Sequence, residues 1–179
     1  TQNEWDLLNK KITLISGARL DKRTDYKLNL SPRIAIAYKP NNKWKITGST
    51  GWGFKAPDFR HMYLNFYNAQ IGYSLIGANV LGNELQTLQQ KGELESGANI
   101  NPYLNNPTLL PEKSFGSHLG AKYSNNHVSI EVSIYRNDIN NLIDVYLLPF
   151  KKTNTRSIYS YHNINRIFSQ GAEGDRSEE

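Results

Sequence analysis

The 179-residue sequence has the length of a single domain, and its 21 basic and 16 acidic residues give a formal net charge of +5. The chain has no cysteine, which excludes disulfide scaffolds, thiolate metal sites and cysteine nucleophiles. The basic residues are spread along the chain without a stripe or a recognisable motif, so no nucleic-acid partner is expected. The 11 tyrosines and three tryptophans are residue types that collect at membrane–water interfaces.

Alternation of apolar and polar residues predicts three strands in the first part of the chain, at 11–20, 32–39 and 43–54. In the first of them Ile12 and Leu14 face one way, and Lys11 and Thr13 face the other. The polar residues 21–30 predict a turn. A tight Pro-Asn-Asn-Lys turn joins the second and third strands, which predicts a hairpin.

Alternation stops at Pro57 and resumes at Ser114, so residues 57–113 are predicted to form one very long loop. Inside this loop Leu81, Leu85 and Leu88 recur at helical spacing. They predict a short amphipathic helix over residues 83–95, with Asn83 as its N-cap.

Five further strands are predicted after the loop, at 114–123, 128–135, 142–150, 158–163 and 167–171. Residues 124–126 form a short turn between the first two. Residues 137–141 and 151–155 are polar breaks. The total is about eight strands, with connections that are alternately short and long.

Two features distinguish a membrane barrel from a soluble sheet. A soluble sandwich seldom carries a structureless loop of this length, whereas outer-membrane barrels combine tight turns on one side with long loops on the other. The apolar face also ends in aromatic residues, namely Tyr38, Trp44, Trp52 and Tyr123. We therefore expect an all-β, antiparallel transmembrane β-barrel segment in contact with a lipid bilayer, although periodicity alone also fits the half-buried strands of a soluble sheet.

Five sequence boxes follow one another along residues 31–173. They are Ser31-Pro32-Arg33 leading to Tyr38-Lys39-Pro40, Gly53-Phe54-Lys55-Ala56-Pro57 with Met62-Tyr63, Asn106–Ser114 (NPTLLPEKS), Tyr135–Ile139 (YRNDI) with Leu142-Ile143-Asp144, and Asn163 with Gln170-Gly171-Ala172-Glu173. In this order the boxes resemble the β-barrel of TonB-dependent outer-membrane receptors. The residues expected to shape the loop ends are Phe54, Ala56, Pro57, Asn106, Pro107, Pro111 and Glu112.

The resemblance implies a barrel of about 22 strands in the bacterial outer membrane, of which this chain supplies about eight. An N-terminal plug domain and a segment that contacts the TonB complex are expected upstream, outside this chain. The implied function is the import of a scarce nutrient (an iron chelate, haem or cobalamin) with energy supplied through TonB. The alternative is a passive porin or adhesin on a similar barrel, which lacks the plug.

No enzyme activity is expected, because the four histidines are scattered without a Ser/His/Asp grouping. No cofactor is expected either, and haem enters only as a transported ligand. The candidate substrate-binding residues of the loop are Lys55, Arg60, His61, Tyr63, Tyr67 and Tyr73.

His61 is the only histidine between Pro57 and Asn106. In haem receptors that this sequence resembles, a loop histidine binds the iron, and imidazole is a good iron ligand. His61 departs from that pattern because it stands where the family usually has Gln or Glu, so a loop-packing role is the alternative. Lys55, Arg60 and Lys113 would give the loop base a positive field for anionic chelates, or else are charges at the level of the lipid headgroups. His118 is expected to face the lumen.

Overall fold

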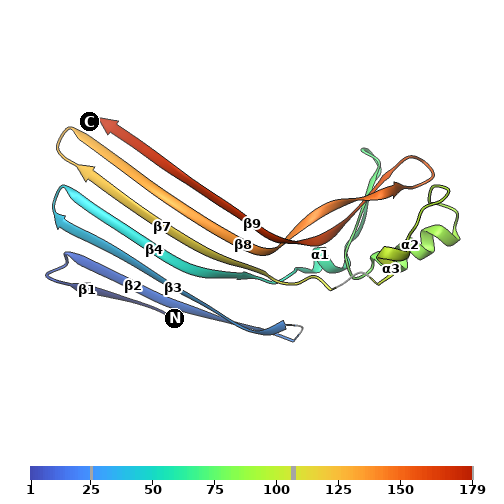
Figure 1. Cartoon of the computed structure of the whole chain (residues 1–179), viewed down its shortest axis with the longest axis horizontal. Coiled ribbons are helices and arrows are strands. Elements are labelled where there is room, and N and C mark those ends of the chain that lie inside the picture. The colour runs from blue at the N-terminus through green and yellow to red at the C-terminus, as the bar shows by residue number, and fades with distance from the viewer. Residues whose placement is uncertain (25, 106–107, 179) are drawn as a thin grey trace. The chain divides into compact units, whose positions relative to one another are not determined.

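The structure is a computed structural model that describes residues 1–24, 26–105 and 108–178. Long antiparallel strands dominate it (Figure 1). The elements in chain order are β1 (Gln2–Leu7), β2 (Ile12–Arg23), β3 (Tyr26–Asn41), β4 (Trp44–Lys55), α1 (Phe59–Tyr63), β5 (Asn65–Asn68), β6 (Tyr73–Ile76), α2 (Leu81–Gln90), α3 (Asn101–Leu104), β7 (Glu112–Ser124), β8 (Val128–Lys151) and β9 (Ser157–Glu178).

The strands form one nine-stranded sheet in the order β1-β2-β3-β4-β7-β8-β9-β6-β5. The long strands β2 and β3 pair antiparallel, as do β3 and β4, and β7 and β8. The short strand β6 instead runs parallel to residues 157–160 of β9. Within the described residues, no helix has the length and apolar character needed to cross a membrane.

The chain divides into two compact regions. The wall region comprises Thr1–Phe54, Lys113–Asn140 and Arg166–Glu179, and it holds β1 to β3 and most of β4 and β7. The loop region comprises Lys55–Glu112 and Asn141–Asn165, and it holds the helices with β5 and β6. Strands β8 and β9 contribute residues to both.

The wall region has one apolar face, which we call the outer face. The strand register places Leu14, Ile36 and Gly48 side by side across β2, β3 and β4, and it pairs Leu119 of β7 with Ile134 of β8. These side chains are not covered by protein: Ile36 is 46% exposed, Leu119 54% and Ile134 56%. A continuous apolar face of this kind is unfavourable in water and suits contact with lipid.

Aromatic pairs mark two levels of the outer face. Trp44 packs against Tyr123 with ring centroids 5.1 Å apart, and Trp52 packs against Phe115 at 4.8 Å. The two tryptophans are eight positions apart on β4, a distance of about 27 Å along a strand. The tilt of barrel strands shortens this height, and the result is comparable to the apolar band of about 25 Å that aromatic girdles enclose in outer-membrane barrels.

The loop region has an apolar core of its own. Leu81 and Leu85 of α2 and Ile158 of β9 are fully buried. The other buried members of this cluster are Ile76, Leu88, Leu94, Ile100, Leu148 and Phe150. Helix α3 packs closely on α2, because a Cβ atom added at Gly82 would lie 2.6 Å from the Leu104 carbonyl oxygen.

The prediction of a turn over residues 21–30 is wrong. Strand β2 continues to Arg23 and β3 begins at Tyr26, with Leu20 opposite Leu30 and Asp21 opposite Asn29. Residues 21–24 (DKRT) are polar throughout, and the alternation of Tyr26, Leu28 and Leu30 with Lys27 and Asn29 is short. Strand pairing extends through both segments although the sequence pattern there is weak.

The predicted break at 137–141 is also absent, because β8 is one strand of 24 residues. Similarly, β9 is one strand of 22 residues in place of the two predicted over 158–171. Strand β1, and the hairpin formed by β5 and β6, were not predicted. The sheet thus has nine strands rather than about eight.

The predicted helix exists, but its bounds and its cap differ. Helix α2 covers Leu81–Gln90, and Leu81, Leu85 and Leu88 are buried as the spacing predicted. Its N-cap is Val80, with no side-chain cap, and Asn83 lies within the helix. Burial of Leu81 in the loop-region core outweighs the capping preference of Asn83.

Candidate functional site

The candidate site is the loop region, and its first feature is the connection that leaves β4. Lys55 Nζ lies 3.0 Å from Glu112 Oε1, which joins the last residue of β4 to the first of β7. The same carboxylate oxygen accepts a hydrogen bond of 3.1 Å from the Ile143 amide. Lys55 is therefore paired, and this pair fixes the two ends of the long connection at each other.

A second set of contacts holds the chain just before β7. The Asn163 side chain accepts a hydrogen bond of 2.7 Å from the Leu110 amide and donates to the Leu110 carbonyl oxygen at 2.8 Å. It also donates to the carbonyl oxygen of Asn141, whose backbone has a positive φ of 56°. One side-chain amide thus satisfies three backbone groups of two separate segments.

The residues predicted to shape the loop ends fall near these contacts. Pro57 is fully buried, Ala56 is half-buried and Pro111 directly precedes Glu112. The Phe54 carbonyl oxygen accepts a hydrogen bond of 2.8 Å from Arg19. The predicted loop-end residues Asn106 and Pro107 lie outside the described residues.

His61 forms part of the N-terminal cap of α1. Asp58 Oδ1 accepts a hydrogen bond from the His61 amide at 2.9 Å, and His61 Nδ1 accepts one from the Asp58 amide at 3.1 Å. This reciprocal capping box, together with an edge-on contact with the Tyr161 ring at 4.9 Å, leaves the His61 side chain 14% exposed. Only Nε2 lies outside the capping contacts.

The two capping residues differ in the cause of their pKa shifts. Burial lowers the pKa of His61, and this effect outweighs the opposite influence of the Asp58 carboxylate 3.0 Å away. The hydrogen bond from the His61 amide is the main cause that lowers the pKa of Asp58. At neutral pH the cap therefore consists of a carboxylate and a neutral imidazole.

The other predicted residues do not form one cluster. Arg60 is paired with Asp58 at 3.1 Å, and the ring of Tyr63 packs on that of Phe59. Tyr67 and Tyr73 lie on opposite faces of the β5–β6 hairpin, because Tyr67 is opposite Ser74, the residue next to Tyr73. Tyr73 contacts the rings of Phe66 and Tyr159.

Tyr67 has two cationic neighbours that the sequence did not reveal. Lys152 Nζ lies 5.5 Å from the centre of its ring, and the Arg156 guanidinium carbon lies 4.8 Å from it. Within the described residues, neither cation has a carboxylate within ion-pair distance. Both belong to the connection between β8 and β9, which appears in the sequence only as a polar break; no residue pattern links it to Tyr67.

The described residues contain no grouping of three His, Asp or Glu side chains that could hold a metal ion. The loop region therefore offers aromatic rings and cations rather than a set of metal-ligating groups. Such a surface suits a ligand that is anionic and apolar or aromatic.

Comparison with known proteins gives consistent results. Residues 1–177 match the family model described as TonB dependent receptor-like, beta-barrel. An iron-regulated outer membrane virulence protein of Vibrio cholerae is 24% identical over 149 residues, which is 83% of this chain and 18% of that protein. The chain thus spans about a fifth of the curated relative that it matches.

Two solved structures share the fold. The siderophore receptor PirA of Pseudomonas aeruginosa superposes with a TM-score of 0.69 at 19% identity, covering 97% of this chain and 29% of that one. A mutant of the ferric enterobactin receptor PfeA of P. aeruginosa in complex with enterobactin gives 0.62 at 20% identity, covering 97% and 23%. With the family model matching nearly every residue, the chain belongs to the TonB-dependent receptor β-barrel family of the bacterial outer membrane.

Proposed function

We propose that the complete protein is an outer-membrane receptor that imports an anionic iron chelate with energy supplied through TonB. We further propose that Tyr67, Lys152 and Arg156 contact the chelate. The observation that carries the proposal is the position of two cations without an acidic partner beside one exposed tyrosine ring.

The electrostatic part of the proposal rests on a contrast within the loop region. Lys55 and Arg60 have carboxylates at 3.0 and 3.1 Å, so much of their positive field is cancelled locally. Lys152 and Arg156 lack such partners among the described residues. An anionic ligand near the Tyr67 ring gains attraction from both cations without displacing an existing ion pair.

The fold and the relatives support active import over a passive pore. The Vibrio cholerae relative is iron-regulated, and the two solved neighbours described above are a siderophore receptor and a ferric enterobactin receptor holding enterobactin. The family to which the chain belongs takes its name from dependence on TonB. These properties belong to the relatives, and we propose them for this protein because it shares their family and fold.

The prediction that His61 binds haem iron stays a prediction. The capping contacts of Nδ1 and the burial of the ring favour a structural role, since a ligand could reach only Nε2. Titration of haem into the full-length receptor and into its His61→Ala variant checks this directly. An unchanged haem spectrum and affinity in the variant ends the ligand assignment.

Binding by the full-length receptor tests the main proposal. The double variant Lys152→Ala/Arg156→Ala is expected to bind a ferric catecholate chelate about 5- to 30-fold more weakly, since two cation contacts of about 0.5–1 kcal/mol each are lost. Lys151→Ala removes a neighbouring lysine that has no described contact with Tyr67 and serves as the control. Equal affinity of the double variant and the control would remove these residues from the site.

A neutral ligand shows whether the double variant loses affinity because two charges are missing or because the loop region is disrupted. Cobalamin binding, if the receptor has any, should not discriminate between the double variant and the wild type. Uptake that persists after removal of the TonB complex would instead indicate a passive pore.

A further inference from the structure

Arg33 lies across a slot made by two glycines on the polar face of the wall region. In the sheet register Arg33 stands between Gly17 of β2 and Gly51 of β4. A Cβ atom added at Gly17 would lie 3.2 Å from Arg33 Nε, and one added at Gly51 would lie 2.9 Å from Arg33 Cβ. Only glycine leaves room on both sides, so the slot determines where the Arg33 side chain runs.

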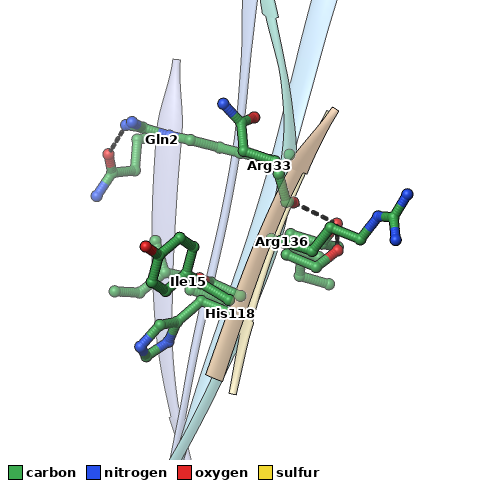
Figure 2. Close-up of a pocket in the computed structure, with 14 residues that line it drawn as sticks. Gln2, Ile15, Arg33, His118 and Arg136 are labelled. Carbon is green, nitrogen blue, oxygen red and sulfur yellow. Dashed lines mark hydrogen bonds between the residues drawn. The ribbon is translucent and has the colours of Figure 1, made fainter. Parts of the chain in front are cut away.

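The guanidinium of Arg33 extends over β2 to β1, where it donates a hydrogen bond to the side-chain oxygen of Gln2 (Figure 2). Gln2, Ile15 and His118 project on the same side of the sheet in this view, whereas the guanidinium of Arg136 points to the other side. Arg136 is held there by Asp138 at 2.8 Å. Of these two arginines, Arg33 is therefore the one whose guanidinium lies on the polar face.

A hollow of about 530 Å³ lies around these side chains. Its lining on the polar face includes Gln2, Ser49, His118, Tyr135 and Asn137, and no residue that lines it is acidic. Two other cations of the polar face have carboxylate partners: Arg19 pairs with Asp21 at 2.8 Å and Lys122 with Glu131 at 3.6 Å. Within the described residues, Arg33 has no carboxylate within ion-pair distance.

We propose that this hollow receives an aspartate or glutamate side chain from a segment of the same protein that lies outside residues 1–179. The chain covers 18% of its curated relative and 29% of the siderophore receptor PirA, so most of the length of these relatives has no counterpart in residues 1–179. In a closed barrel the polar face encloses the lumen. A segment that enters the lumen meets the guanidinium of Arg33 there, held in place by the slot between Gly17 and Gly51.

Charge and geometry together select a carboxylate. A guanidinium covered by another segment loses water, and an acidic partner offsets that loss where an apolar or basic partner does not. The planar fork of arginine binds a carboxylate through two parallel hydrogen bonds, and the hydrogen bond to Gln2 occupies one nitrogen. The proposal does not depend on which substrate the receptor imports.

Site-specific photo-crosslinking in the full-length receptor tests this inference. A benzophenone amino acid replaces Ser49, which lines the hollow and lies opposite Ala35, so that Arg33 is retained. Mass spectrometry then locates the cross-linked peptide. We expect one peptide from outside residues 1–179 that contains Asp or Glu, and a several-fold lower yield when Arg33→Gln is added.

Matched variants keep the test decisive. Lys45→Gln removes a positive charge from β4 outside this hollow and should leave the yield unchanged. Arg33→Glu combined with replacement of the identified acid by arginine should restore the yield, because the pair is then reversed. Heat-modifiable migration in gels confirms that each variant barrel is folded. If Arg33→Glu fails to assemble, the test rests on Arg33→Gln, which is the milder substitution.

Three results would overturn the proposal: cross-links confined to residues 1–179, a cross-linked peptide without acidic residues, or a cross-link yield that is unchanged by Arg33→Gln. A variant that loses import of an anionic chelate while keeping the cross-link yield would assign Arg33 to the substrate instead. Failure of the substrate proposal at Tyr67 leaves this experiment unaffected, so the two are distinguishable.

Discussion

Leu85 of the loop region is fully buried, whereas Leu119 of the wall region is 54% exposed. The contrast is general: each large apolar side chain that is buried within the described residues belongs to the loop region. The loop region is built like a small soluble protein, with apolar residues inside. The wall region places its apolar residues on the surface, where lipid covers them. One chain thus follows two opposite rules for its apolar residues, because its two regions meet different solvents.

Truncation of a core leucine should give the largest difference between the two regions. Leu85→Ala is expected to destabilise the loop region by about 2–5 kcal/mol, since it leaves a cavity that α2 cannot fill. Leu119→Ala should cost far less, because flexible lipid chains occupy the vacated space. Hydrogen exchange of the full-length receptor in lipid, followed over residues 81–90 and 115–123, measures both effects. Equal losses of protection in the two variants would contradict the view that apolar side chains are buried in the loop region and covered by lipid in the wall region.

A charge added to the outer face of the wall region should be far more costly than the same charge added to its polar face. Leu119→Arg is expected to cost about 2–4 kcal/mol where the outer face contacts the centre of the bilayer. Ser133→Arg is the matched control, because Ser133 lies opposite Gly120 on the polar face of the same strand pair. Assembly yields of the folded, heat-modifiable barrel compare the two variants. A greater loss with Ser133→Arg would mean that the faces have been assigned the wrong way round.

The wall region was predictable from the sequence wherever lipid imposes a strict alternation. Residues 12–20, 34–38 and 128–134 carry that pattern, and each lies in a strand. Prediction failed at residues 21–30 and 137–141, which are mostly polar and carry at most a short alternation, at Tyr26, Leu28 and Leu30. Pairing with neighbouring strands holds these segments extended, and a single segment of sequence carries no record of its partners.

The loop region was less predictable because its contacts are distant in sequence. The spacing of Leu81, Leu85 and Leu88 revealed the helix, since helical periodicity is local. The approach of Lys152 and Arg156 to Tyr67 spans more than 80 residues and has no local signal. The motif residues Glu112 and Asn163 were recognisable, but their hydrogen bonds to Ile143 and Leu110 emerged only from the structure.

The Asn163 contacts test how the loop region is held at its base. Asn163→Ala removes three hydrogen bonds and leaves backbone groups of Leu110 and Asn141 without this partner, at an expected cost of about 1–3 kcal/mol. Protection from exchange should fall over residues 108–112 while that of β7 near Leu119 is retained. Asn165→Ala, two residues along the same strand and exposed, provides the control. A loss confined to β7 would show that the wall, rather than the loop base, depends on Asn163.

The smallest expected effect is a pH dependence of α1. Burial lowers the pKa of His61 in the folded loop below its ordinary value of 6.5, so between these two values the open form binds more protons than the folded form. The stability of the cap is therefore complete above pH 6.5 and declines as the pH falls through the folded pKa. The pKa of Asp58 is also lowered, but its contribution is lost only below the ordinary value of 3.8.

Exchange over residues 58–63 should thus accelerate between pH 7 and pH 5 after correction for the intrinsic rate. His61→Gln keeps a hydrogen-bond acceptor for the Asp58 amide and should remove this acceleration. An acceleration that survives the substitution would show that a group other than His61 is responsible.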